Sequence, residues 1–426
     1  MARYGIRITV DGYLVKNARI VSLRGGSGDL LPRRGAALSQ LGVIPSGSIV
    51  FRAGQIEWVG AGAPPAGVRG DLVEVDAAGR VVLPGFVDCH THACWAGERW
   101  DEWDLKSAGK SYLEILAAGG GIHATVRAVR AASTESLARG VETRALQMAQ
   151  YGTTTLEVKS GYGLDCETEI RMLEAIEQAA QNSPLRIVST YLGAHAIDPA
   201  RGDFVTETIE RTLPAILARY PGITTDAYCE KGAWSVEECV RYFTRARLLG
   251  SGVRVHTDQF NSLGMIPAAL ALGALTLDHL EAASDSDLEA VAKSSTIAVG
   301  LPGTAFCLGT PTIRARKFVD AGGALALATN ANPGSAPIRG MPIIVSFAVR
   351  EMNLTPAEAL TTVTWNSACA LGLAHLCGSI ESGKSADLVL WACDDERALG
   401  YELSGPLPDL VWARGKLVRS TDPQFR

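Results

Sequence analysis

The central part of the chain, residues 83–373, alternates short apolar runs with longer stretches that have the 3.6-residue period of an amphipathic helix. Eight of the apolar runs have the length of a buried β-strand. They span residues 86–92, 153–160, 186–195, 224–230, 253–259, 275–280, 296–303 and 324–330. Helical patterns lie between them, at residues 133–152, 167–181 and 235–250 among others. Eight strand–helix units predict an α/β fold, a closed parallel (β/α)8 TIM barrel.

An open, doubly wound α/β sheet is the alternative to a barrel. That fold usually carries a glycine-rich dinucleotide turn directly after its first strand. No such turn follows residues 86–92, and this favours the barrel.

Both ends of the chain have a different texture, with short Val- and Ile-rich runs broken by Gly and Asp. These runs are residues 8–23, 47–60, 71–82, 385–393 and 408–420. The two ends are predicted to pair into one small β-sandwich domain, residues 1–82 plus 374–426, beside a barrel domain of residues 83–373. Residues 26–47 look like a loop-rich insertion whose role the sequence does not indicate.

Composition narrows the class of protein. The net charge is −5 and the basic residues are scattered, so nucleic acid is not an expected partner. No run of 18 apolar residues predicts a membrane span, and the N-terminus lacks the apolar core of a signal peptide. The nine cysteines include no Cys-x-x-Cys pair, which favours reduced thiols in a cytoplasmic protein.

Polar side chains able to do chemistry stand at the C-terminal ends of nearly all the predicted strands. In chain order they are His90, His92, Lys159, Tyr162, His195, Glu230, His256, Asp258, Gln259, Asp278, His279 and Asn330. In a barrel of this type these ends converge on the active-site face. His90 and His92 are two residues apart on a strand, so both point to the same face and could bind one metal ion.

The chain resembles the imidazolonepropionase family of the amidohydrolase superfamily. The superfamily pattern is the segment Pro-Gly-Phe-Val-Asp-Cys-His-Thr-His at residues 84–92. The narrower motifs are residues 111–116, 118–125, 159–164, 193–196, 229–232, 278–280, 301–304 and 332–335. Together they cover the barrel, and the resemblance extends over both flanking β segments.

The resemblance implies one divalent or ferric metal ion, zinc or iron, held by His90, His92, His256 and the residue at position 330. It also implies the reaction, which is metal-dependent hydrolysis of the cyclic amide of 4-imidazolone-5-propanoate to N-formimino-L-glutamate in histidine degradation. Three imidazoles and one oxygen ligand would leave a coordination place for water, whose pKa the ion lowers. A small-molecule substrate and a homodimer are further implications.

The chemistry of individual side chains, in addition to the resemblance, predicts which residues contact the substrate. The planar guanidinium of Arg99 suits the substrate carboxylate. Tyr112 and Tyr162 could donate hydroxyl hydrogen bonds to that carboxylate or to the ring. His195 is expected to face the ring, and Gln259 to contact the ring nitrogens.

Two further groups complete the predicted site. His279 is expected to polarise the carbonyl or to hold the attacking water. A turn after the eighth strand is expected to bind the polar edge of the ring through Asn332, Gly334 and Ser335. The catalytic positions are therefore Asn330, His279 and Gln259.

Other polar residues have supporting roles in this interpretation. Ligating histidines usually need carboxylate partners that set the tautomer of the ring. Candidates for such support are Glu157, Lys159, Glu230, Asp258 and Asp278. His123 follows three glycines and is equally compatible with a site role and a structural one, whereas His375 is expected to be structural.

One residue departs from the family pattern. The resemblance implies an Asp at the end of the eighth strand that binds the ion and accepts the proton of the water, but this chain has Asn330. An amide oxygen ligates weakly and is not a useful base near neutral pH. The chain could be an inactivated variant, a natural relative that only binds, or an enzyme with another base, such as His279; the intact remainder of the site favours the first. A hydrolase or deaminase of another small cyclic amidine or lactam is the alternative enzyme.

Overall fold

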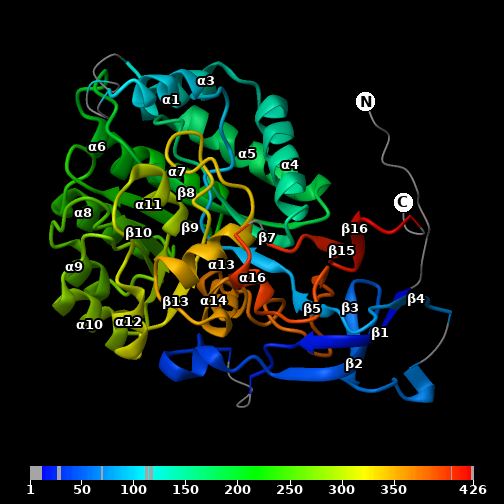
Figure 1. The fold of residues 1–426 in the computed structure, drawn as a ribbon. Coiled ribbons are helices and arrows are strands. Elements are labelled where there is room, and N and C mark those ends of the chain that lie inside the picture. The colour runs from blue at the N-terminus through cyan, green and yellow to red at the C-terminus, as the bar shows by residue number, and fades with distance from the viewer. Residues whose placement is uncertain are drawn as a thin grey trace.

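The structure is a computed structural model. It describes residues 12–25, 30–68, 71–110, 114, 119–403 and 405–423. Two β-sheets organise these residues, one in the middle of the chain and one built from both of its ends (Figure 1).

The central sheet has eight parallel strands that follow one another in chain order. They are β6 (Phe86–Asp88), β7 (Thr153–Lys159), β8 (Arg186–Ala194), β9 (Thr224–Cys229), β10 (Val253–Thr257), β11 (Thr276–His279), β12 (Ile297–Gly300) and β13 (Leu325–Leu327). Segments after β6 and β13 join the two edges, since the Asn330 amide donates to the His90 carbonyl at 3.0 Å and the His92 amide donates to the Ala331 carbonyl at 2.9 Å. The predicted barrel is confirmed.

Helices follow the barrel strands and surround them (Figure 1). They are α1 (Trp100–Ser107), α3 (Ile122–Ala131), α4 (Thr134–Ala149), α5 (Cys166–Asn182), α6 (Phe204–Glu207), α7 (Leu213–Arg219), α8 (Val236–Leu248), α9 (Met265–Ala271), α10 (Asp285–Lys293), α11 (Pro302–Leu308), α12 (Ala315–Asp320), α13 (Met341–Arg350), α14 (Pro356–Thr362), α15 (Trp365–Ala370) and α16 (Ala398–Tyr401). A π-helical turn, η3 (Thr208–Thr212), joins α6 to α7. The helices predicted at residues 133–152, 167–181 and 235–250 correspond to α4, α5 and α8.

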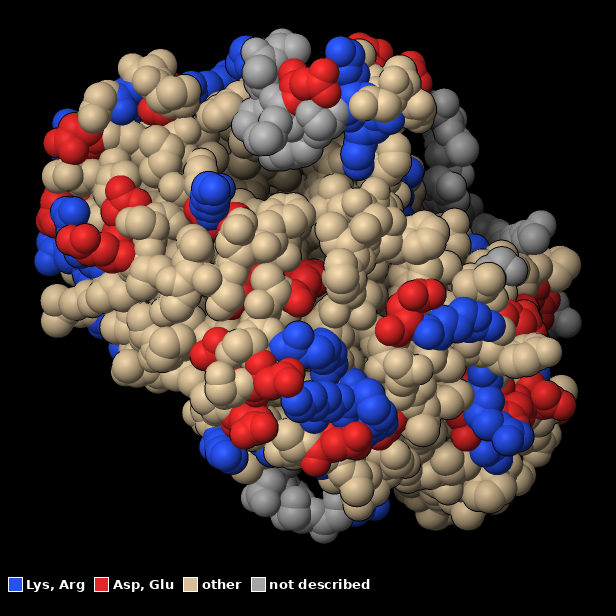
Figure 2. Space-filling view, turned by 60° about the vertical axis from the view of Figure 1, so that its left-hand side comes forward, with Lys and Arg blue, Asp and Glu red and all other residues tan. Residues whose placement is uncertain are grey.

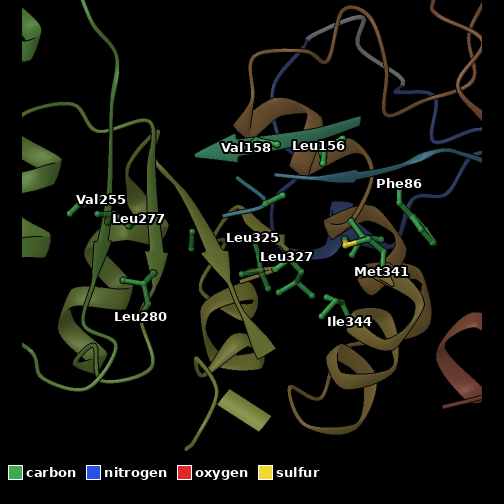
Figure 3. Packing of buried hydrophobic residues seen from close by; sticks show 14 of the residues in the cluster. Phe86, Leu156, Val158, Val255, Leu277, Leu280, Leu325, Leu327, Met341 and Ile344 are labelled. Carbon is green, nitrogen blue, oxygen red and sulfur yellow. The ribbon is translucent and has the colours of Figure 1, made fainter. Parts of the chain in front are cut away.

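Alternation along the barrel strands separates the apolar core from the polar interior. Successive side chains on a strand point to opposite faces. On β10, Val255 packs in the main apolar cluster, whereas its neighbours Arg254 and His256 make buried polar contacts with residues of other barrel strands. Figure 3 shows apolar strand residues of this kind, with Leu325 and Leu327 of β13 near Ile344 of α13. The charged side chains are therefore directed toward the barrel axis.

The second sheet joins both ends of the chain. It contains β1 (Gly12–Val21), β2 (Val43–Arg52), β3 (Gln55–Ala61), β4 (Val73–Asp76), β5 (Val81–Pro84), β14 (Leu388–Trp391), β15 (Pro408–Ala413) and β16 (Lys416–Ser420), in the order β16-β15-β14-β5-β1-β2-β3 with β4 also paired to β1. Figure 1 shows the blue N-terminal strands and the red C-terminal strands on the same side of the barrel.

This terminal sheet is strongly curled. In a flat sheet, strands three places apart, such as β1 and β15, would lie about 14 Å apart. The rings of Tyr13 on β1 and Trp412 on β15 nevertheless have centroids 5.6 Å apart, and Phe51 on β2 lies 5.6 Å from the same Trp412 ring. The sheet therefore closes over its own apolar core, as a β-sandwich does.

The C-terminal segment also contacts the barrel. Arg350 of α13 donates to the Gly400 carbonyl of α16 at 2.6 Å, and Trp391 of β14 packs on Phe86 of β6 with centroids 5.3 Å apart. The division into residues 1–82 plus 374–426 and residues 83–373 therefore stays our proposal.

The predicted insertion at residues 26–47 partly differs from expectation. Residues 26–29 lie outside the described residues, and residues 43–47 begin β2 instead of continuing a loop. The middle of the segment forms a 3-10 turn, η1 (Gly35–Ser39), and anchors to the barrel helices. The Arg33 amide donates to Asn366 at 2.8 Å, and Thr361 donates to the Leu38 carbonyl at 2.7 Å. This segment therefore ties the terminal sheet to the barrel.

Charged residues of both signs are mixed on the surface. On the face in Figure 2, Lys and Arg side chains lie beside Asp and Glu side chains and form no broad field of one sign. Within the described part of the chain, none of the helices has the length and apolar character needed to cross a membrane.

Candidate active site

Three histidines lie together at the C-terminal end of the barrel strands. His90 and His92 follow β6, and His256 is on β10. Each offers a ring nitrogen, and these nitrogens all lie within 4.8 Å of one another. All three side chains are buried, with exposed fractions of 0 to 3%. The residues predicted from the sequence as metal ligands thus form one cluster.

Carboxylates orient two of these rings. Nδ1 of His90 lies 2.6 Å from Asp278, and Nδ1 of His256 lies 3.1 Å from Asp226. A carboxylate accepts a hydrogen bond, so in both rings Nδ1 carries the proton and Nε2 is left with its lone pair. This carboxylate–histidine arrangement is the one that holds metal-ligating histidines in other proteins.

The nitrogen spacing fits a tetrahedral ion. Nε2 of His256 lies 3.3 Å from Nε2 of His92. Two imidazole nitrogens on a tetrahedral zinc ion, each 2.0–2.1 Å from the metal, would be about 3.3–3.4 Å apart. Nε2 of His90 is buried and has no hydrogen-bond partner among the described residues. An ion would satisfy all three nitrogens.

Burial keeps the three ligand histidines neutral. Desolvation lowers the pKa of His90 and of His92 well below the ordinary value, with Lys159 adding to the effect at His90 and His195 at His92. Desolvation also lowers the pKa of His256, although the Asp226 carboxylate opposes it. A metal ion binds the neutral imidazole, so this environment favours metal binding at neutral pH.

A network of buried charges lies beneath the histidines. Nζ of Lys159 is 2.7 Å from Glu157 and 2.7 Å from Asp226. Arg254 is 3.1 Å from Glu157 and 3.2 Å from Asp278. Burial alone would raise the pKa of the Asp226 carboxyl, but His256 and Lys159 hold it well below its usual range. Three carboxylates and two cations therefore form one connected network inside the barrel, with one negative charge in excess.

Asn330 lies next to His90 where the barrel closes, because its backbone amide donates to the His90 carbonyl at 3.0 Å. Its Nδ2 lies 2.9 Å from the hydroxyl of Thr304, and its Oδ1 is buried with no hydrogen-bond partner among the described residues. Its backbone is left-handed, with φ of 54°, a conformation that Asn and Asp tolerate better than most residues. An unsatisfied carbonyl oxygen is thus available to an ion, but it carries no charge.

The backbone is strained at several of these strand ends. His279 and Leu280 have φ values of 85° and 72°, and Asp258 has a φ of 53°. Non-glycine residues with positive φ cost roughly 1–3 kcal/mol each and cluster at functional sites. Residues of this kind also stand elsewhere, at Ala53 and Ala78 among others, so the strain is a feature of this barrel end without being confined to it.

Aromatic rings and imidazoles form one wall of the site. His195 stacks on His92 with centroids 5.0 Å apart, and Tyr162 lies 5.2 Å from His195 and 6.0 Å from His92. Desolvation lowers the pKa of His195 to about 3, so this ring is neutral. Tyr162 is buried, and burial raises the pKa of its phenol. These two residues therefore lie beside His92, and their contacts with a substrate stay a prediction.

Arg99 lies against the turn after β13. A Cβ atom added to Gly334 would lie 2.0 Å from the Arg99 guanidinium, so only glycine permits this approach. Arg99 also donates to Glu102 at 2.6 Å, while its buried Nε has no partner among the described residues. The guanidinium is therefore held in place and still has unused donors.

The turn at residues 332–335 is organised by the Asn332 side chain. Its Oδ1 accepts from the amides of Gly334 at 2.9 Å and Ser335 at 2.8 Å, and its Nδ2 donates to the Asn330 carbonyl at 2.7 Å. Both Oδ1 and Nδ2 of Asn332 are therefore bonded within the loop. The side chain holds the loop in shape and is not free to bind a ligand.

Gln259 and His279 are two further predicted residues at this end of the barrel. Gln259 accepts a hydrogen bond from the Tyr228 hydroxyl at 2.8 Å, which leaves its amide nitrogen to donate. The His279 ring lies 5.6 Å from His256 and 6.1 Å from His90. Its Nδ1 is 3.3 Å from Glu281. His279 therefore lies beside the cluster, and Gln259 is linked to it through Tyr228, whose ring lies 5.9 Å from His256.

In the described part of the chain, the remaining predicted residues are not seen in contact with the three histidines. Tyr112 lies outside the described residues. His375 is exposed, and His123 lies on α3 near Asp198, where its charge influences the pKa of that carboxyl. Glu230 accepts from the amides of Lys231, Phe260 and Asn261 and from the Asn261 side chain, so it braces two loops.

Asp226 and Arg254 were missed in the sequence analysis. Arg254 is two residues before ligand His256, so both side chains point into the barrel. Asp226 pairs with Arg254 in the strand register, and both are buried in otherwise apolar strands. A charged residue two places from a ligand on a buried strand is the signal that could have revealed Arg254.

We predict that Asp278→Asn weakens zinc binding roughly 10- to 100-fold, because losing an orienting carboxylate typically has that effect. Competition with a chromophoric chelator measures the dissociation constant. Asp285→Asn, the same change at an exposed position on α10, is the control and should bind zinc like the parent. Equal affinities in the two variants would show that the contact with His90 does not support the metal.

Comparison with known proteins agrees with this geometry. A sequence model of the amidohydrolase family matches residues 81–418. An imidazolonepropionase from Herpetosiphon aurantiacus is 42% identical over 405 residues, which cover 92% of this chain and 95% of that protein. An imidazolonepropionase from Symbiobacterium thermophilum is 41% identical, with 96% of this chain and 97% of that protein covered.

Solved structures share the fold at low sequence identity. A 5-methylcytosine deaminase from Klebsiella pneumoniae has a TM-score of 0.72 at 16% identity, covering 96% of this chain and 98% of that one. Guanine deaminase from E. coli has a TM-score of 0.72 at 15% identity, covering 96% and 99%. Taken with the family match and the long alignments above 40% identity, the chain belongs to the amidohydrolase family and, within it, to the imidazolonepropionases.

Proposed function

We propose that this chain is a hydrolase of histidine degradation that opens the cyclic amide of 4-imidazolone-5-propanoate to give N-formimino-L-glutamate. The observation that carries the proposal is the buried cluster of His90, His92 and His256 in a chain 42% identical to an imidazolonepropionase. The substrate is a small planar ring with a carboxylate tail. The site combines three histidines that could hold one metal ion with Tyr162, and Arg99 lies nearby.

His90, His92 and His256 would hold the ion, with Oδ1 of Asn330 as a weak fourth ligand. When bound, zinc or iron supplies Lewis acidity, which lowers the pKa of a coordinated water and polarises a carbonyl. Either metal suits a site rich in imidazole. Metal analysis of protein grown with each metal would identify the preferred one.

The protein side chains orient the substrate in this proposal. Arg99 binds the carboxylate tail through its planar guanidinium, and Tyr162 donates its hydroxyl to the same end of the substrate. His195 offers an unprotonated nitrogen to a ring N–H, since its Nδ1 already donates to the Gly161 carbonyl. Gln259 donates its amide N–H to the ring from the opposite side.

At position 330 this chain has no carboxylate that could accept the proton of the attacking water. Asn330 has no useful basicity, and Gln259 is an amide as well. Two further imidazoles lie beside the cluster, those of His195 and His279. Since this proposal assigns His195 to a ring N–H, His279 is the group that accepts the proton of the attacking water. We therefore propose slow hydrolysis by the chain as it stands, with His279 as the acceptor. A protein that binds the substrate without opening it is the second candidate, and the two neutral amides favour it.

We predict that Arg99→Gln raises KM for imidazolone propanoate roughly 10- to 100-fold, because a hydrogen bond to a charged group contributes about 1.5–3 kcal/mol. The change should be small for an analogue whose tail ends in a neutral amide. Steady-state kinetics with both compounds, in the Asn330→Asp background, measures the difference. Arg127→Gln, at an exposed position on α3, is the matched control. An equal loss with both compounds would remove Arg99 from carboxylate recognition and favour a different cyclic amide or amidine as substrate.

We further propose a homodimer that functions in the cytoplasm. All nine cysteines are free thiols, and most of them are buried, in keeping with a reducing compartment. Sedimentation of the purified chain would test the dimer.

A further inference from the structure

Glu169 is a buried carboxylate that the chemistry above does not use. It lies near the start of α5 and is 1% exposed. Its oxygens accept three backbone N–H groups, from Gly161 at 3.0 Å, Gly163 at 2.7 Å and Leu164 at 3.1 Å. Among the described residues it has no lysine or arginine partner within ion-pair distance. Burial raises the pKa of this carboxyl, and the hydrogen bonds from the loop oppose that effect. Both carboxyl oxygens are therefore directed at one short loop.

The loop wraps closely around this carboxylate. Residues 160–164 join β7 to α5, and Gly161 and Leu164 have φ values of 108° and 54°. A Cβ added to Gly163 would lie 2.8 Å from the Glu169 carboxylate. Backbone N–H groups that converge on one anion from a strained loop define the shape of that loop.

The same loop carries two parts of the site wall. Tyr162 stands between two of the anchored amides, and its ring lies 6.0 Å from ligand His92. The Gly161 carbonyl is 3.0 Å from Nδ1 of His195. Because a carbonyl only accepts, His195 must carry its proton on Nδ1 and present Nε2 without one.

We propose that Glu169 is a positioning residue, whose carboxylate holds residues 160–164 in the shape that places Tyr162 and sets the tautomer of His195. The proposal rests on the proposed function, because the substrate contacts of Tyr162 and His195 belong to it. Glu169 itself does not touch the substrate site through its side chain; its oxygens face the loop amides.

Glu169→Gln tests the proposal because it keeps the volume and removes the charge. One amide oxygen replaces two carboxylate oxygens, and the new NH2 group would face backbone N–H donors. At least one loop amide then loses its acceptor. Glu167→Gln is the matched control, since Glu167 is an exposed carboxylate in the same helical turn.

Three readouts are measured on the full metal-loaded chain. Hydrogen exchange at the amides of Gly161, Gly163 and Leu164 should be at least about tenfold faster in Glu169→Gln. The nitrogen-15 shifts of the His195 ring should move from a pure Nδ1–H tautomer toward a mixture. In the Asn330→Asp background, KM for imidazolone propanoate should rise at least about tenfold while kcat changes by less than about threefold. Glu167→Gln should match the parent in all three.

Unchanged loop exchange and an unchanged His195 signal in Glu169→Gln would overturn the proposal. If that variant does not fold, Gly163→Ala replaces it, because its added Cβ displaces the loop from the carboxylate, and the same three changes are expected. Failure of the proposed function would be visible separately. In that case no variant opens the ring, while the exchange and the His195 spectrum still decide the role of Glu169.

Discussion

Asn330→Asp is expected to raise the rate of ring opening by roughly 100- to 10,000-fold, the range that a positioned general base contributes. The Asn330 backbone amide donates to the carbonyl of His90, and its Oδ1 is buried with no partner among the described residues, so a carboxylate would replace an oxygen that makes no contact there. The left-handed backbone at φ 54° suits Asp as well as Asn. Zinc retention should increase too, since a charged oxygen replaces a neutral one.

Steady-state turnover of imidazolone propanoate by the two proteins, each with its metal content measured, gives the ratio. Asn353→Asp is the control, because it introduces the same charge at an exposed position whose backbone is also left-handed, with φ of 54°. Equal rates in the parent and Asn330→Asp would mean that another group takes the proton. His279→Ala in both backgrounds would then show whether His279 is that group.

Lys159→Met is expected to lower the free energy of unfolding by about 3–5 kcal/mol, as breaking a buried ion pair does. Lys159 is fully buried and lies 2.7 Å from both Glu157 and Asp226. Methionine has a similar length and no charge, so two buried carboxylates would lose their shared cation. Asp226 also orients His256, and weaker metal binding should accompany the loss of stability.

Urea unfolding of the metal-free proteins measures this effect without a contribution from metal binding. Lys16→Met is the matched control, because Lys16 forms an equally short ion pair with Glu74 at the surface, at 2.6 Å. That variant should unfold at the same urea concentration as the parent. If Lys159→Met has the same free energy of unfolding as the control, the ion pairs of Lys159 with Glu157 and Asp226 do not stabilise the barrel.

The fold could be predicted because local patterns and global architecture agree. The eight apolar runs, the amphipathic helices between them and the β-rich ends correspond to the barrel and the terminal sheet. The three ligand histidines could also be predicted, since His90 and His92 share a strand face and His256 ends another strand. The prediction of a loop at residues 43–47 was wrong. Pro45, Ser46 and Gly47 are residue types typical of loops, although they lie in the first half of β2.

Other parts of the site depend on distances that no local pattern contains. Asp226 reaches His256 only because β9 and β10 pair in a particular register. Arg254 reaches Asp278 only because β10 and β11 lie side by side. The contacts of Asn332 are local, in contrast, because its side chain accepts from residues 334 and 335, as an Asn at the start of a turn commonly does.

Metal-dependent ring opening is best tested by product formation from 4-imidazolone-5-propanoate by zinc-loaded parent and Asn330→Asp proteins, before and after removal of the metal with a chelator. We expect N-formimino-L-glutamate from both proteins, much faster from Asn330→Asp, and from neither after chelation. If both proteins hold one zinc ion and bind the compound but neither forms product, the chain is a binding protein and the proposed hydrolysis is wrong.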